Sequence, residues 1–243
     1  MTRKIWLLPL LLGSTCVPAR AFDMARIVQG RTTYSKGASV LNLAYDQASP
    51  RWSDPSKDTV ESEVELEHAF TDRLDLSAAA QAQETRRSQA HVNRLAFETD
   101  YRLLDAPFQV APRLGIAPSI RGEGLQFQLG STELKNIGEW TLMLDYEAEF
   151  GQTPGRTSFA VLQHQFETGV FYRFGLRGLT GTTWEYDTTG ESQAGLVLGG
   201  SISKNIFLGY KQQFPLNRKS PSSESELLLS FYFGPTALAG WDF

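Results

Sequence analysis

The sequence predicts an all-β protein, an antiparallel, up-and-down transmembrane β-barrel of about twelve strands. Three observations lead to this fold class. Apolar and polar residues alternate with a period of two over many runs of roughly nine to twelve residues. Glycine, proline, asparagine, aspartate and serine bound those runs. Their length matches the nine to eleven residues, roughly, that a tilted strand needs to cross a bilayer.

Residues 1–21 have the pattern of an export signal. Two basic residues precede an apolar run, Ile5 to Leu12, which is too short to cross a bilayer as a helix. A small-x-small motif, ARA, follows, so we expect cleavage before Phe22. Cys16 is the only cysteine and would leave with the signal, and the mature chain would then have no thiol. The alternative is an uncleaved anchor helix.

The rest of the chain divides into three parts. Residues 22–36 are weakly patterned, and we expect either a lead-in or a plug segment there. Residues 37–234 carry the barrel, and residues 235–243 form a C-terminal tail. We expect strands at about 38–46, 60–70, 74–84, 92–103, 108–119, 123–132, 139–150, 158–174, 178–187, 192–202, 205–214 and 224–234.

The clear strands each have one apolar face and one face that is charged, amide or glycine. In the strand that begins "VESEVELEHAF", Val64 and Leu66 lie opposite the parity of Glu65 and Glu67. The stretches "RLAFETDYRLL", "EWTLMLDYEAEF", "LQHQFETGVFYRF" and "NIFLGYKQQF" repeat this pattern. In a membrane barrel the apolar face contacts lipid and the polar face lines the interior.

The connections between strands tend to alternate in length. Residues 71–73 and the pair "KN" are short, whereas "DQASPRWSDPSKDT" and "PLNRKSPSSES" are long. A barrel with short turns at one end and longer loops at the other has this alternation, and an even strand number places both termini at the short-turn end. A soluble β-sandwich is the alternative fold, but aromatic residues near strand ends, such as Tyr101 and Trp140, favour interfacial girdles and therefore the barrel.

The hairpin "AFTDRLDL", the alternation, the signal and the final strand "ELLLSFYF" together resemble Gram-negative outer-membrane β-barrel proteins of porin-like type. The resemblance implies location in the cell outer membrane and insertion from the periplasm by the barrel-assembly machinery. It also implies a role for the aromatic-ended last strand in assembly. The residues expected to carry that signal are Leu229, Phe231, Phe233 and, at the end of the tail, Phe243.

The polar parity supplies the residues that we expect to line the lumen. The acidic residues of this set are Glu61, Glu63, Glu65, Glu67, Asp75, Glu98, Asp100, Asp145, Glu147, Glu149 and Glu167. The basic residues are Arg94, Arg102, Arg113, Arg173 and Lys211. Because acids exceed bases, the lumen should favour cations. The predicted function is a passive pore or transporter-like channel for small hydrophilic solutes, and the alternatives are a barrel sealed by its own salt bridges or a secreted β-sandwich binding protein.

Several other classes of function have little support. A net charge of −4 does not favour binding to the negatively charged backbone of nucleic acid. His68 and His164 fall on apolar parities, and no motif surrounds His91 and Ser88, so we predict no enzyme and no catalytic residue. We expect no cofactor. We also expect no metal site, because alternate carboxylates on one strand lie about 6.6 Å apart, too far to share a small cation without a neighbouring strand. Trp52, in a proline-containing loop, is the feature that favours adhesion. Oligomeric state is left open.

Overall fold

The computed structural model describes residues 24–49, 59–85, 88–105, 107–118, 125–152, 159–175, 177–220 and 223–234. The expected signal at 1–21, the loop that contains Trp52, and the tail at 235–243 with Phe243 lie outside these ranges. The side chains of Ser88 and His91 are likewise not described.

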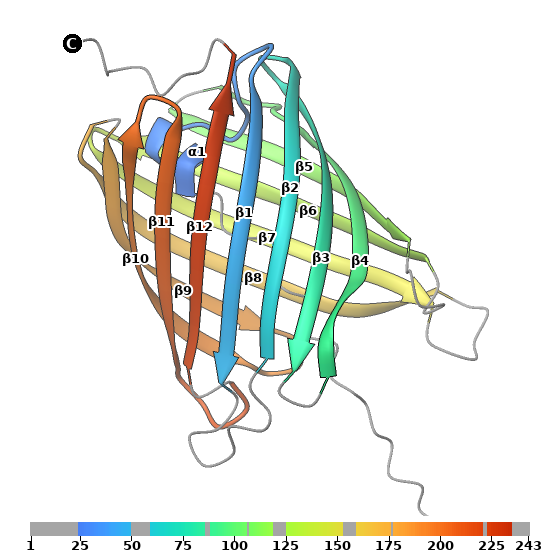
Figure 1. The fold of residues 1–243 in the computed structure, drawn as a ribbon. Coiled ribbons are helices and arrows are strands. Elements are labelled where there is room, and N and C mark those ends of the chain that lie inside the picture. The colour runs from blue at the N-terminus through green and yellow to red at the C-terminus, as the bar shows by residue number, and fades with distance from the viewer. Residues whose placement is uncertain are drawn as a thin grey trace, which may run out of the picture.

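Twelve antiparallel strands form one closed barrel, in which each strand pairs with its neighbours in sequence and β1 pairs with β12 (Figure 1). This confirms the predicted fold class and strand number and excludes the β-sandwich. The strands are β1 (Ser39–Ser49), β2 (Thr59–Thr71), β3 (Leu74–Thr85), β4 (Ser88–Tyr101), β5 (Phe108–Pro118), β6 (Leu125–Ile137), β7 (Trp140–Gln152), β8 (Phe159–Arg173), β9 (Gly178–Asp187), β10 (Ser192–Ser203), β11 (Ile206–Pro215) and β12 (Ser223–Phe233).

Alternation along each strand determines which residues face out of the barrel. Phe97, Leu114 and Leu198 all lie on the outer face and are half exposed or more. Exposure of so many large apolar side chains would be costly in water but suits a lipid environment. Trp140 and Tyr172 form an edge-to-face pair, with ring centroids 5.1 Å apart, where β7 begins and β8 ends. This position is typical of an aromatic girdle.

The two ends of the barrel differ in their connections. At the end where β1 begins and β12 ends, the turn between β2 and β3 consists of Asp72 and Arg73, and Lys204 and Asn205 join β10 to β11. We call this the short-turn end, and the opposite one, where β1 ends and β12 begins, the long-loop end. The short-turn end is at the top of Figure 1.

A short helix, α1 (Met24–Gln29), lies inside the barrel at the short-turn end (Figure 1). Gly30 follows it in the left-handed region, with φ 61°, and its N–H donates to the Ile27 carbonyl 2.9 Å away. A helix of six residues is not stable by itself in water. Its conformation therefore depends on the barrel wall around it.

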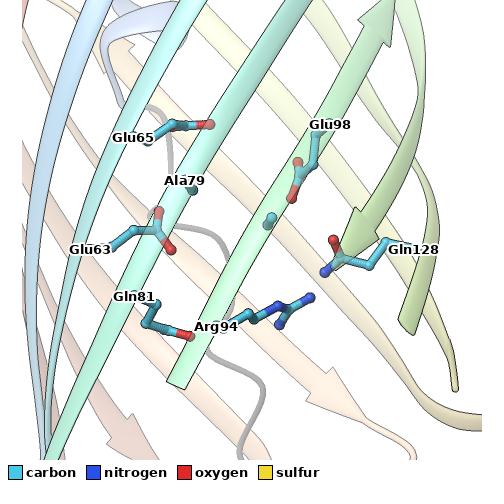
Figure 2. Close-up of a pocket in the computed structure, with 8 residues that line it drawn as sticks. Glu63, Glu65, Ala79, Gln81, Arg94, Glu98 and Gln128 are labelled. Carbon is cyan, nitrogen blue, oxygen red and sulfur yellow. The ribbon is translucent and has the colours of Figure 1, made fainter. Parts of the chain in front are cut away.

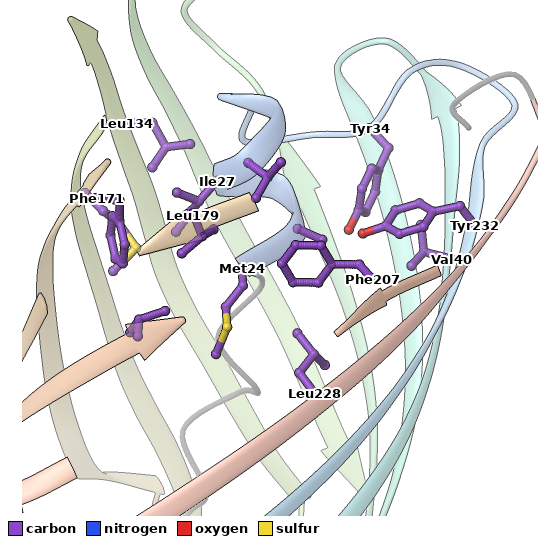
Figure 3. Close-up of a cluster of buried hydrophobic side chains, with 14 of the residues drawn as sticks. Met24, Ile27, Tyr34, Val40, Leu134, Phe171, Leu179, Phe207, Leu228 and Tyr232 are labelled. Atoms are coloured by element: carbon purple, nitrogen blue, oxygen red, sulfur yellow. The ribbon is translucent and has the colours of Figure 1, made fainter. Parts of the chain in front are cut away.

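An apolar core fills the space between α1 and the wall (Figure 3). Met24 and Ile27 of the helix point toward wall residues Phe171, Leu179 and Phe207, all of which are buried. Further wall members of this core are Val40, Ala69, Leu134, Met143, Val197, Leu228 and Tyr232. Gly209 lets α1 approach β11 closely, because a Cβ there would lie 2.4 Å from the Met24 sulfur.

The expectation that the inward face is polar along its whole length is therefore wrong at the short-turn end. Ala69, Leu134, Met143 and Phe171 continue the inward parity of their strands, but they are apolar. Their partner is the helix rather than water, so their burial is favourable. Polar residues occupy the inward face from this layer toward the long-loop end.

Candidate functional site: the lumen of the barrel

Arg26 of α1 connects the helix to a group of wall carboxylates. Its guanidinium forms ion pairs with Glu67, with Asp75 at 3.4 Å and with Asp100 at 2.9 Å. The same guanidinium lies over the ring of Tyr34, 5.0 Å from its centroid. All three carboxylates are 3% exposed or less, so this charge cluster is shielded from water.

Backbone groups of residues 30–36 bind the wall as well. Gln109 accepts from the Thr32 N–H at 3.1 Å and donates to the Gly30 carbonyl at 2.6 Å. Asn136 donates to that carbonyl from β6 at 2.9 Å. Asp75 accepts the Tyr34 N–H at 2.8 Å. Residues 24–36, which we call the N-terminal segment, are thus held by apolar contacts on one side and by polar contacts on the other.

Arg113 is a second centre of charge, one layer toward the long-loop end. Its Nε donates to Asp100 at 3.1 Å, and its terminal nitrogens lie 3.5 Å from both Asp145 and Glu147. A further contact, of 3.8 Å, joins it to Glu98. This single base therefore links carboxylates on β4 and β7, two strands that are not neighbours in the sheet.

Lys211 is the corresponding centre on the other side of the lumen. It is 2% exposed, and its Nζ donates to Glu167 at 2.7 Å and lies 3.8 Å from Glu185. A buried ammonium needs such partners because desolvation of an isolated charge is costly.

Most of the remaining wall carboxylates accept hydrogen bonds from amides. Gln83 donates to Glu61 at 2.7 Å, and Gln213 donates to Glu185 at 2.7 Å. The same arrangement recurs around the barrel, in the pairs Asn42–Glu65, Gln81–Glu61, Gln128–Glu147, Gln163–Asp187, Gln165–Glu185 and Gln193–Glu224. A neutral amide satisfies a carboxylate oxygen without cancelling its charge.

A pocket opens into the lumen beside the Arg26 cluster (Figure 2). It holds about 380 Å³ not filled by protein atoms, part of it open to solvent. Arg94 and Glu98 reach it from β4 and Glu63 and Glu65 from β2, and Gln128 faces them across the pocket. Carboxylates outnumber bases in its lining. A cation at this pocket would therefore be favoured over an anion, if the carboxylates are ionised.

The structure places the predicted residues as follows. The predicted acids lie on the inward faces of β2, β3, β4, β7 and β8. Arg94, Arg113 and Lys211 join them there, with Arg94 4.0 Å from Glu149. Arg102 and Arg173 lie at the short-turn rim instead, where they donate to the carbonyls of Asp72 and Gly138.

Two sets of residues that matter here escaped sequence reasoning. Arg26 lies in a weakly patterned segment, and nothing local indicates that it meets acids far along the chain. The wall glutamines were assigned to the polar parity, but their role as donors to the carboxylates was not predicted, and the alternation of glutamine with acid was the signal for it.

At the long-loop rim, Glu191 follows β9 in the connection to β10. Its N–H donates to Asp187 at 2.9 Å. Burial, together with the negative charges of Asp187 and Glu224, raises the pKa of the Glu191 carboxyl to about 7.

Two histidines lie away from the lumen. His68 pairs with the Ser39 hydroxyl at 2.8 Å, and His164 with the Tyr146 hydroxyl at 2.8 Å. Among the described residues, no group of three or more histidine, cysteine, aspartate or glutamate side chains has a geometry that could hold a metal ion. No helix within the described ranges is long and apolar enough to cross a membrane.

A polar lumen inside a closed barrel with an apolar exterior defines the class of an outer-membrane β-barrel, and the solved structures that resemble it include Gram-negative outer-membrane porins. The KdgM porin has a TM-score of 0.59 and 12% identity, over 80% of this chain and 99% of that chain. The NanC porin has a TM-score of 0.55 and 12% identity, over 81% and 99%. The translocator domain of the autotransporter NalP from Neisseria meningitidis has a TM-score of 0.51 and 11% identity, over 86% and 93%.

At these identities the likeness establishes the fold, which is that of the porins. No protein-family model matches the chain, and no curated protein matches it by sequence.

Proposed function

We propose that this protein is a passive outer-membrane channel for small hydrophilic solutes and that it prefers cations. The observation that carries the proposal is the lumen wall, where several carboxylates, among them Glu61 and Glu224, accept hydrogen bonds from neutral amides. Within the described ranges, the inward-facing bases away from the rim are Arg26, Arg94, Arg113 and Lys211, against a much larger set of acids. Such a wall lowers the free energy of a cation in the lumen and raises that of an anion.

The similarity to porins supports the same proposal. In this arrangement the chain is exported by its signal, Leu229, Phe231 and Phe233 on the outward face of β12 serve assembly by the barrel-assembly machinery, and the short-turn end faces the periplasm. Outer-membrane barrels have their short turns on that side. The protein has no catalytic step in this proposal, and its partners are lipid and the permeating solute.

The experiment is conductance of the full chain in planar bilayers under a salt gradient. We expect a reversal potential of the sign that cation preference gives. The triple variant Glu63→Gln, Glu65→Gln, Glu98→Gln should lose much of that preference, because it removes charge from the pocket wall. Glu133→Gln is the matched control, since Glu133 lies on the outward parity of β6. An anion-selective wild type would overturn the proposal.

A barrel sealed at the short-turn end is the second candidate, and the N-terminal segment packed in the lumen is the observation that favours it. Full chain and a variant that lacks residues 24–36 should be compared in the same bilayers, after heat-modifiable migration shows that each is folded. Conduction by the full chain supports a channel, whereas conduction by the shortened variant alone means that the N-terminal segment seals the barrel. If neither folded protein conducts, the barrel is structural.

A further inference from the structure

We propose that Glu67, Asp75 and Asp100 form a guanidinium-binding site in the barrel wall. Arg26 of the chain itself occupies this site in the present state, and the site takes the guanidinium group of a cationic solute when the N-terminal segment withdraws. The transport consequence rests on the proposed channel function, whereas the binding site does not depend on it.

The site is built by three adjacent strands. Asp75 of β3 and Asp100 of β4 are direct cross-strand partners, and Glu67 of β2 lies opposite Ser77, two residues along β3 from Asp75. Like charges directly opposite one another destabilise a sheet, and these three are 1%, 1% and 3% exposed. Burial of such a group is tolerable only if a cation is bound among its members.

The present occupant shows which cation fits. One terminal nitrogen of Arg26 pairs with Glu67 and Asp75, and the other donates to Asp100 at 2.9 Å. Tyr34 covers the guanidinium plane. A planar fork with several donors can reach three carboxylates from one position, whereas an ammonium is a compact point charge. Tyr34 belongs to the N-terminal segment, so its aromatic face favours a flat cation only while that part of the segment stays in place.

The wall component of the site has support of its own. Asp100 also accepts from Arg113, 3.1 Å away, and Arg113 is held in turn by Asp145 and Glu147. Asp100 therefore keeps its orientation without Arg26. Arg113 alone cannot compensate the cluster, because it is shared among several other acids. Withdrawal of the N-terminal segment would leave a buried negative cluster that is strongly stabilised by a cation from solution.

The site also has an approach. Glu65 and Glu63 precede Glu67 on the same face of β2 and line the pocket shown in Figure 2. A cation that enters from the long-loop end would meet this acidic surface before it reaches Arg26. A solute with a guanidinium group can then compete with Arg26 for the three carboxylates.

The test uses the full chain refolded in detergent, with methylguanidinium as the probe and isothermal titration calorimetry as the measurement. Arg26→Ala should bind one methylguanidinium at least about tenfold more tightly than the wild type does. Tetramethylammonium, which has the same charge but no N–H donor, should bind Arg26→Ala at least about tenfold more weakly than methylguanidinium does. Adding Glu67→Gln should abolish the binding. Equal binding of the two cations, or equal binding to wild type and Arg26→Ala, would contradict the proposal.

If Arg26→Ala folds poorly, refolding yield becomes the readout. Methylguanidinium in the refolding buffer should then restore the yield more than tetramethylammonium does, and equal yields would contradict the site. Failure of the two proposals is distinguishable. If Arg26→Ala binds methylguanidinium but the protein never conducts, only the proposed channel function is contradicted. If the protein conducts but Arg26→Ala binds no methylguanidinium, only the proposed binding site is contradicted.

Discussion

The two ends of the lumen are filled by different kinds of interaction. At the short-turn end, many inward residues are apolar and pack on α1, as in the core of a soluble protein, although Asp75, Gln109 and Asn136 hold the N-terminal segment by polar contacts. Toward the long-loop end they are carboxylates and amides that bond to one another across neighbouring strands. Stability in the first half therefore depends on close packing, and in the second half on matched donors and acceptors.

Arg26 lies where the two halves meet. Its helix belongs to the packed half, but its guanidinium belongs to the polar half. The N-terminal segment is therefore held by both kinds of interaction at once. A solute that displaces the segment replaces only the ionic part, so the apolar contacts of α1 would be lost without replacement. This difference makes the comparison testable with variants of each half.

Truncation of a side chain in the packed half should have the largest effect. Phe207 is fully buried against α1 (Figure 3), so Phe207→Ala should lower the free energy of unfolding by about 3–5 kcal/mol. Phe214→Ala on the same strand is the control. Phe214 is 46% exposed on the outer face, where lipid chains can fill the space that truncation leaves. Denaturant unfolding in lipid vesicles measures both, and equal losses would show that the packed half is no true core.

Loss of an amide donor in the polar half should have a smaller effect. Gln213 is buried and donates to Glu185 at 2.7 Å. Gln213→Met leaves that carboxylate with fewer donors, at a cost of about 1.5–3 kcal/mol. Gln47→Met changes an exposed glutamine on the outward parity of β1 and is the control. An unchanged unfolding midpoint for Gln213→Met would mean that water replaces the amide and that this half is well hydrated.

The same contrast explains what the sequence could predict. Period-two alternation depends on one residue and its immediate neighbours, so the twelve strands, their approximate bounds and their inward parity could be predicted from it. Glu67 and Asp100 were assigned to the interior on this basis. Alternation does not reveal what an inward residue faces, and Phe171 and Phe207 are apolar because a segment from the other end of the chain lies against them.

The function of the N-terminal segment was beyond prediction for a similar reason. Residues 22–36 are too short to have a periodic pattern, and α1 forms only because the wall surrounds it. Arg26 is more than forty residues from each of its acidic partners in the chain. Propensity gives no information on contacts of that kind, whereas charge gives a partial clue: a buried acidic cluster on adjacent strands requires a cation from somewhere.

The smallest effect is expected outside both halves, at Glu191 on the long-loop rim. Its pKa is raised from the ordinary value of 4.5 to about 7, so the folded state binds this proton more tightly than the unfolded state does. Protonated Glu191 contributes stability that is full below about pH 4.5 and is lost as the pH rises to about 7. Because the carboxyl is only partly buried, we expect the effect to be small.

Glu191→Gln should therefore flatten the decline in stability between pH 4.5 and 7 and make the barrel slightly more stable than wild type at pH 8, as measured by unfolding midpoints at several pH values. Glu139→Gln, which removes an exposed carboxylate from a turn at the other end, controls for the loss of one negative charge. If the stability of Glu191→Gln declines with pH as much as that of the wild type, Glu191 is not the cause, and the wall carboxylates are the remaining candidates. The polar half, rather than its rim, would then be the part of the molecule that responds to pH.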